Sequence, residues 1–238
     1  MAATPESRPG RGTARRFPLW IPALIAVVVL AAGAYAVLGG DDDAPLATGA
    51  SQGTSEGATS PDPSAGASGE QVAVADVEIT GAELPPYDSA ADDEAIGRTF
   101  PAISGTGVLR GDAISIPNDD GRAKLVLFLA HWCPHCQAEV PVVRDWFERQ
   151  GPDDVDVYAV STAVAPDRGN YPPADWLARE NWTFPTIADD EFSSALAAAG
   201  GTGFPFFVAV DAEGKVVQRA SGELSEAKLA GLVSQLQP

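Results

Sequence analysis

Residues 124–141 read KLVLFLAHWCPHCQAEVP, and they carry the strongest indication of the fold in the chain. Its first part, 124–130, is a strand-length run that is apolar after Lys124, as in a central strand buried on both faces of a sheet. The only two cysteines of the chain follow in Cys133-Pro134-His135-Cys136, and both histidines lie in the same stretch. Apolar residues then recur at helical spacing as far as a Gly-Pro stop at 151–152. The sequence therefore predicts a buried strand that leads into a helix beginning at two thiols.

The pattern of strands and helices continues to the end of the chain. Residues 155–160 are a second apolar run, and a Gly-containing turn between residues 206–211 and 215–219 predicts a β-hairpin. We expect helices at 174–181, 192–199 and 224–236, and shorter extended segments at 72–80, 111–116 and 184–187. This order predicts an α/β domain at residues 96–238, with a mixed central sheet and helices on both faces, after an N-terminal extension at residues 71–95.

A segment before this domain has the composition of a membrane anchor. Residues 1–16 form a basic tail with four arginines and one acid, and residues 17–38 carry no charge. A helix of that length rises roughly 33 Å, which is enough to cross a hydrocarbon core of about 30 Å. The arginines before it and the acids after it predict a cytoplasmic N-terminus and an exported remainder, with the domain at the cell membrane. The alternative is a cleaved signal peptide, because Ala34-Tyr35-Ala36 resembles a cleavage site.

Composition narrows the possible functions further. Residues 39–70 are rich in Gly, Ala, Ser, Thr, Pro and Asp, which predicts a flexible linker. The chain has 15 Lys and Arg against 33 Asp and Glu, for a formal charge of −18, which disfavours binding to nucleic acid. Two closely spaced cysteines constrain little of the unfolded chain, so a structural disulfide is a weaker interpretation than chemistry at the thiols.

The chain resembles a known family at several motifs. These are Gly97-x-x-Phe-Pro101, residues 128–136 with the two thiols, Glu139-Val140-Pro141, and residues 203–214. Together they are similar to the membrane-anchored, extracytoplasmic TlpA/ResA-like thiol-disulfide oxidoreductases of the thioredoxin superfamily. The resemblance covers roughly residues 95–238 and implies a thioredoxin-like fold. It also implies disulfide exchange with exported protein thiols or disulfides and a membrane redox partner that recycles the dithiol. No cofactor is predicted.

The residues at the motif also support exchange chemistry without the resemblance. Exchange needs a thiolate that attacks and a second thiol that resolves the mixed disulfide. Cys133 is expected at the helix N-terminus, where free N–H groups and the helix dipole favour the anion, and Pro134 suits the first helical turn. His135, when protonated, would stabilise the thiolate further. We therefore predict Cys133 as the nucleophile and Cys136, one turn deeper, as the resolving thiol.

The resemblance adds roles for residues beyond the Cys-x-x-Cys motif. It implies that Glu139 moves protons for the buried cysteine, although an ordinary solvated glutamate is the alternative. It also implies that Pro205 is cis and faces the thiols, with the backbone at Phe204 pairing with an extended partner. Trp132 is predicted to shield the site and contact substrate, and His131 either tunes the site or is solvated.

Some alternatives stay open at this point. The irregular residues 161–173 are a candidate partner-contacting loop. The same cysteines could belong to a copper or zinc handling protein, although a structural zinc site normally joins two separated ligand pairs. A thiol peroxidase is a further possibility, although its resolving thiol usually lies far from the attacking one. The direction of electron flow, reductase or oxidase, is undecided, because the Pro-His dipeptide is similar to that of a strong oxidant and the flanking residues to those of reductants.

Overall fold

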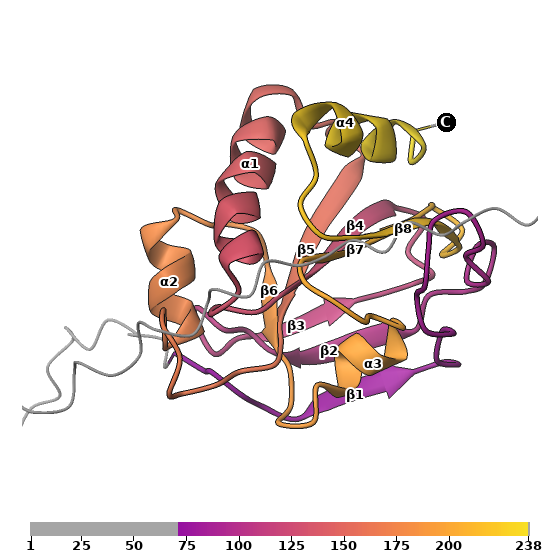
Figure 1. Cartoon of the computed structure of the whole chain (residues 1–238). Helices are drawn as coiled ribbons and strands as arrows, with labels where there is room; N and C mark the ends of the chain where they lie inside the picture. The colour runs from indigo at the N-terminus through magenta and orange to yellow at the C-terminus, as the bar shows by residue number, and fades with distance from the viewer. Residues whose placement is uncertain (1–70, 238) are drawn as a thin grey trace, which may run out of the picture. The chain divides into compact units, whose positions relative to one another are not determined.

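A computed structural model describes residues 71–237 of the chain (Figure 1). The predicted basic tail, membrane anchor and linker at residues 1–70 lie outside the described residues. Within the described part, no helix is both long enough and apolar enough to cross a membrane. The elements, in chain order, are β1 (Val77–Thr80), β2 (Ala102–Thr106), β3 (Ala113–Ile116), β4 (Ala123–Leu129), α1 (Pro134–Gln150), β5 (Val155–Ser161), α2 (Pro173–Arg179), β6 (Thr186–Ala188), α3 (Ser194–Ala198), β7 (Phe206–Val210), β8 (Val216–Ser221) and α4 (Glu226–Ser234).

The predicted mixed central sheet is confirmed. Five strands lie in the order β6-β5-β4-β7-β8, in which β4, β5 and β6 are parallel, β7 is antiparallel to β4, and β8 is antiparallel to β7. Every residue of β4 is buried, as expected for the central strand of a sheet covered on both faces. The strand that leads to the two cysteines is therefore held on both sides by neighbouring strands.

The two faces of the sheet are covered by different layers (Figure 1). Side chains of α1, α2 and α4 pack with Leu125, Leu127 and Leu129 of β4 on one face. Val126 and Phe128 point to the other face, where they pack with α3 and with strands β2 and β3. Helices thus lie on both faces, as predicted, but a second antiparallel sheet of order β1-β2-β3 covers much of the second face.

Residues 77–95 pack onto the same body as the thiol-bearing sheet. Strand β1 pairs with β2, and Leu84 is buried in the core of the second face. Asp93 and Arg219 of β8 form an ion pair in which both side chains are at most 1% exposed, with Arg219 Nε 3.0 Å from Asp93 Oδ2. Because a buried charge is stable only when it is paired, this contact fixes the segment before β2 against the edge strand β8.

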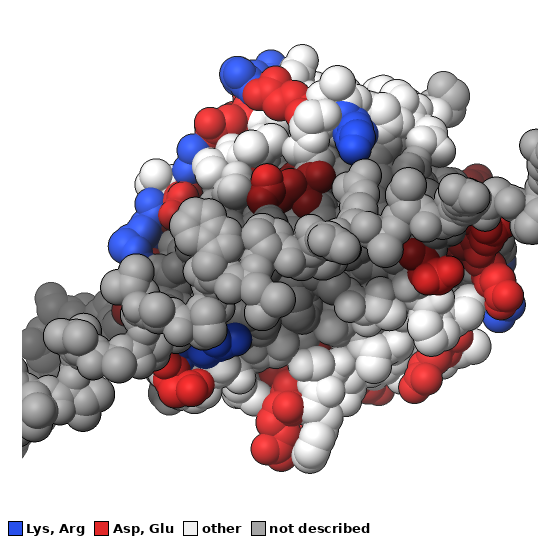
Figure 2. Space-filling view, viewed as in Figure 1, with Lys and Arg blue, Asp and Glu red and all other residues white. Residues whose placement is uncertain are grey.

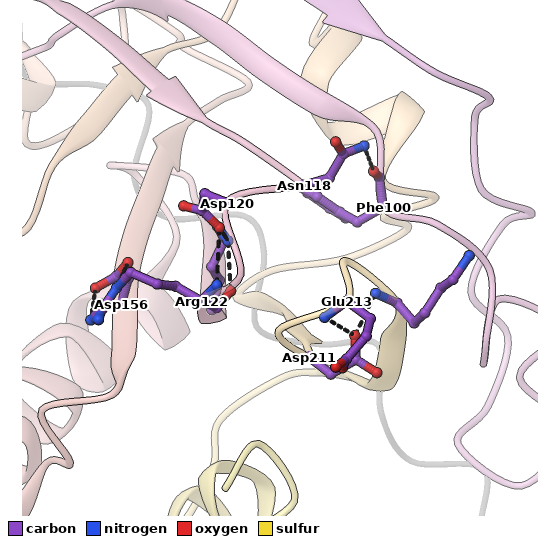
Figure 3. Close-up of polar contacts among 9 residues, drawn as sticks. Phe100, Asn118, Asp120, Arg122, Asp156, Asp211 and Glu213 are labelled. Carbon is purple, nitrogen blue, oxygen red and sulfur yellow. Dashed lines mark hydrogen bonds and ion pairs between the residues drawn. The ribbon is translucent and has the colours of Figure 1, made fainter. Parts of the chain in front are cut away.

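Polar contacts fix the end of β4 that lies opposite the two cysteines (Figure 3). The guanidinium of Arg122 donates to both carboxylate oxygens of Asp156 on β5, at 2.7 and 2.6 Å. The Asn118 amide donates to the carbonyl of Phe100 at 2.6 Å, and Asp211 accepts from the backbone N–H groups of Glu213 and Lys215 in the β7–β8 turn. These contacts hold the turns around the start of β4 in place.

The surface is predominantly acidic, as the composition requires. Figure 2 shows acidic side chains spread around one face of the molecule, with fewer basic ones between them. The formal charge of −18 repels other anions. An unpaired basic side chain on this surface therefore affects which partners can bind beside it.

Candidate active site

The sequence places Cys133 at the point where β4 has ended and α1 begins. Cys133 is the N-cap of α1, with extended backbone angles of φ −78° and ψ 119°, and Pro134 is in the first turn. No side chain caps this helix end, so N–H groups of the first turn remain free next to the residue that carries the thiol. Cys133 is 6% exposed and is a free thiol. The predicted positions of Cys133 and Pro134 are confirmed.

Cys136 lies one helical turn deeper and is not exposed at all. Its sulfur accepts a hydrogen bond from the backbone N–H of Ala130 at 3.4 Å. Burial raises the pKa of the Cys136 thiol well above its usual range, and the nearby Cys133 and Glu139 add to this, while the Ala130 hydrogen bond opposes it. The two thiols therefore differ in depth, and the deeper one needs a base before it can react.

A cis proline faces the first thiol, as the resemblance implied. The Phe204–Pro205 peptide bond is cis, and the Phe204 carbonyl oxygen lies 4.0 Å from the Cys133 sulfur. The rings of Phe204 and Trp132 meet edge to face at 6.0 Å between their centroids. Trp132, Cys133 and the Phe204–Pro205 bond thus form one continuous region at the end of β4.

Glu139 is a buried carboxylate and not a solvated one. It is 1% exposed, and its Oε2 atom accepts from the backbone N–H of Leu224 at 2.8 Å. Its Oε1 atom has no hydrogen-bond partner. Burial, together with the negative charge of Glu223, raises the pKa of Glu139 to about 7, against the opposing effect of the Leu224 bond. A carboxyl group with this pKa can both accept and release a proton near neutral pH.

His135 has a partner that the sequence did not predict. Its Nδ1 atom donates to Oε1 of Glu223 at 2.6 Å, and the two side chains are 66% and 49% exposed. Glu223 lies in the loop between β8 and α4, where Gly222 donates to the carbonyl of Pro205 and Leu224 donates to Glu139. One short loop therefore touches the helix that carries the thiols, the buried carboxylate and the cis proline.

His131 is not solvated, which corrects one of the two predicted environments. It is completely buried. Its Nδ1 atom lies 2.8 Å from the Gly169 carbonyl oxygen, and its Nε2 atom accepts from the Ala165 N–H at 3.1 Å. Both nitrogens are therefore bound to the backbone of the loop between β5 and α2. Burial lowers the pKa of His131, which agrees with the neutral ring that these two bonds require.

The donors that could bind a metal do not converge. Within residues 71–237, no three His, Cys, Asp or Glu side chains are placed together so that they could hold a metal ion. Both nitrogens of His131 are occupied by backbone groups, and Nδ1 of His135 is bound to Glu223. The described residues thus offer no observation in favour of the metal-handling alternative.

The fold and the site together define a class of protein. A buried strand that leads to Cys-x-x-Cys at a helix N-terminus, faced by a cis proline, is the arrangement of a thioredoxin-fold dithiol protein. Residues 95–236 match the family model described as Redoxin, and the chain belongs to this family.

Individual relatives are consistent with this family. Sporulation thiol-disulfide oxidoreductase A of Bacillus subtilis is 27% identical over 105 residues, which span 44% of this chain and 62% of that relative. Thiol-disulfide oxidoreductase ResA of Bacillus cereus is 22% identical over 152 residues, which span 64% and 84% of the two chains. The crystal structure of a DsbF homologue from Corynebacterium diphtheriae, 19% identical, matches with a TM-score of 0.52 over 64% of this chain and 99% of that chain, which supports the fold alone.

Proposed function

We propose that this chain is a membrane-anchored thiol-disulfide oxidoreductase that exchanges disulfides with exported proteins through Cys133 and Cys136. The observation that carries the proposal is the pair of free thiols at different depths at the start of α1, opposite the cis Phe204–Pro205 bond. The names of the relatives, which are thiol-disulfide oxidoreductases, support the activity. The uncharged residues 17–38 support an anchor with the domain outside the cytoplasm.

In the reducing direction, the exchange takes two steps at these atoms. The Cys133 thiolate attacks one sulfur of a partner disulfide, the partner S–S bond breaks, and the other partner sulfur leaves as a thiolate. Cys136 then loses its proton and attacks the Cys133 sulfur, which forms the Cys133–Cys136 disulfide and releases the second partner thiolate. The partner gains two electrons and the site loses two. The oxidising direction is the reverse of these steps.

Glu139 is the group in this proposal that takes the proton from Cys136. The thiol is buried, so its deprotonation needs a nearby base. With a pKa of about 7, Glu139 is partly ionised at neutral pH, and its Oε1 atom is free of other partners among the described residues. His135 would stabilise the Cys133 thiolate when its ring is protonated. The backbone at Phe204 would pair with an extended partner segment, and a membrane redox partner would recycle the dithiol.

Serine variants of the two cysteines test the proposal in the full chain. We expect Cys133→Ser to abolish the reduction of insulin disulfides by dithiothreitol-recycled protein. Cys136→Ser should instead accumulate mixed disulfides through Cys133, because the second step is blocked. Non-reducing electrophoresis and mass spectrometry measure both outcomes. Full multiple-turnover activity of Cys136→Ser would refute the assignment of the resolving thiol.

A further inference from the structure

The loop between β5 and α2 is fastened to the two residues that precede Cys133. The Trp132 indole N–H donates to the Ala163 carbonyl at 2.7 Å. The buried His131 ring bridges the Gly169 carbonyl and the Ala165 N–H, as described above. Because the carbonyl can only accept and the N–H can only donate, the ring must be neutral, with its proton on Nδ1. Three hydrogen bonds between buried or half-buried groups therefore set the position of residues 163–169 relative to the nucleophile.

This loop carries one basic side chain, Arg168, beside the site. The Arg168 guanidinium carbon lies 4.7 Å from the centroid of the Trp132 ring, a distance typical of a cation–π contact. Arg168 is exposed, and no ion pair joins it to Asp167 or to any other carboxylate in residues 71–237. On a chain with a formal charge of −18, Arg168 thus places a cation over the ring of the residue that precedes the nucleophile.

Arg168, Trp132 and Phe204 together form a wall on one side of Cys133. The Trp132 ring contacts the guanidinium on its face and the edge of Phe204, while the Phe204 carbonyl lies 4.0 Å from the Cys133 sulfur. On the side of α1, the Glu223 carboxylate accepts a hydrogen bond from Nδ1 of His135 at 2.6 Å. The residues that flank a partner cysteine bonded to Cys133 would lie along this wall, where Arg168 is a cation without an ion-pair partner in residues 71–237.

We propose that Arg168 is a specificity-determining residue, which favours partners with Asp or Glu within two positions of the cysteine that bonds to Cys133. The inference rests on the proposed disulfide exchange and adds the chemical class of its partners. Opposite charges at an exposed site contribute about 0.2–1 kcal/mol, which corresponds to a rate ratio of at most about fivefold. The preference should shrink as salt is added, because exposed charges are screened within about 10 Å at 0.1 M ionic strength.

The test uses the reduced full chain with Cys136→Ser, so that the mixed disulfide is the final product. The substrates are peptides with one cysteine, which is flanked by Glu, Gln or Lys. A disulfide joins this cysteine to thionitrobenzoate. Attack by Cys133 on the peptide sulfur breaks that disulfide and releases the coloured thiolate, whose absorbance gives the rate. The measured quantity is the ratio of the rates for the Glu and Lys peptides at low salt.

A matched variant at the other end of the molecule separates a local effect from net charge. R168E and K215E change the net charge equally, but Lys215 lies in the β7–β8 turn, at the end of the sheet opposite the cysteines. We expect R168E to lower the Glu-to-Lys ratio by about fivefold relative to K215E, because the reversed charge repels the Glu peptide and attracts the Lys peptide. Equal ratios in the two variants would overturn the role of Arg168 and leave the exchange function intact. If no peptide formed a mixed disulfide with Cys133, the proposed function itself would fail.

Discussion

Glu139 is a carboxyl group whose charge opposes folding. It is 1% exposed, only one of its oxygens is hydrogen-bonded, and its pKa is raised to about 7 from 4.5. An acid whose pKa is higher in the folded state binds protons more tightly there, so its contribution to stability is greatest at low pH. That contribution falls as pH rises from about 4.5 to about 7 and is constant above this window.

We predict that Glu139→Gln removes this pH dependence. Relative to the variant, the wild type should lose roughly 3 kcal/mol of unfolding free energy between pH 4.5 and pH 7.5, from a shift of about 2.5 pKa units at 1.36 kcal/mol each. Urea unfolding at several pH values measures the difference. Glu148→Gln is the control, because it removes an exposed carboxyl group from the same helix. A flat difference for Glu139→Gln would contradict the prediction.

At the scale of an element, the β5–α2 loop has little secondary structure and depends on His131. Two backbone groups of the loop, the Ala165 N–H and the Gly169 carbonyl, have the imidazole as their partner. A buried polar group that loses its partner costs about 1–3 kcal/mol. His131 therefore supplies two of the hydrogen bonds that hold the loop, in addition to the bond from Trp132 to Ala163.

We predict that His131→Leu destabilises the domain by about 2–4 kcal/mol and increases hydrogen exchange at the Ala165 amide. His131→Asn should recover part of the loss, because its amide can still donate to Gly169. His135→Leu is the matched control, since His135 is 66% exposed and its ion pair with Glu223 contributes little. Native-state hydrogen exchange and denaturant unfolding measure both effects. Unchanged protection at Ala165 in His131→Leu would show that the loop is held by other contacts.

The sequence predicts the elements whose signals are local. The fully buried run of β4, the helix that starts at Cys133 and the β7–β8 hairpin were all identified because apolar periodicity and turn residues lie within each element. Strand β2 was not identified, because its Ala-Ile-Ser-Gly-Thr sequence is short and contains Gly, and its pairing with β1 and β3 is a tertiary contact.

The contacts around the thiols were harder to predict for the same reason. Glu223 meets His135 across 88 positions of sequence, and His131 meets Gly169 across 38. No spacing rule relates residues so far apart, since their contact depends on the packing of α4 and α2 onto the sheet. The two predicted environments for His131, a tuning group or a solvated one, also left out a ring that is buried as a structural bridge.

The two ends of the central strand β4 have different roles: one end is held by polar contacts, and the other leads to the reactive thiol. At one end, the Arg122 and Asp156 side chains and the β7–β8 turn hold the strand in place (Figure 3). At the other end, the strand leads to Cys133 at the start of α1, where the helix N-terminus favours a negative charge. A thiolate exists only in the reduced state of the dithiol, so every group that stabilises it raises the reduction potential.

From the groups around the Cys133 thiolate, we predict a reduction potential between that of thioredoxin (about −270 mV) and that of the strong oxidant DsbA (about −120 mV). Protonated His135 would stabilise the Cys133 thiolate, and Glu223 at 2.6 Å offsets part of that charge. His135→Gln should therefore lower the potential by about 30 mV, which corresponds to about 1.4 kcal/mol for two electrons. Equilibration of the full chain with glutathione or dithiothreitol buffers measures both values. A wild-type potential at or below that of thioredoxin would show that His135 does not stabilise the thiolate, and would favour the reducing direction of exchange.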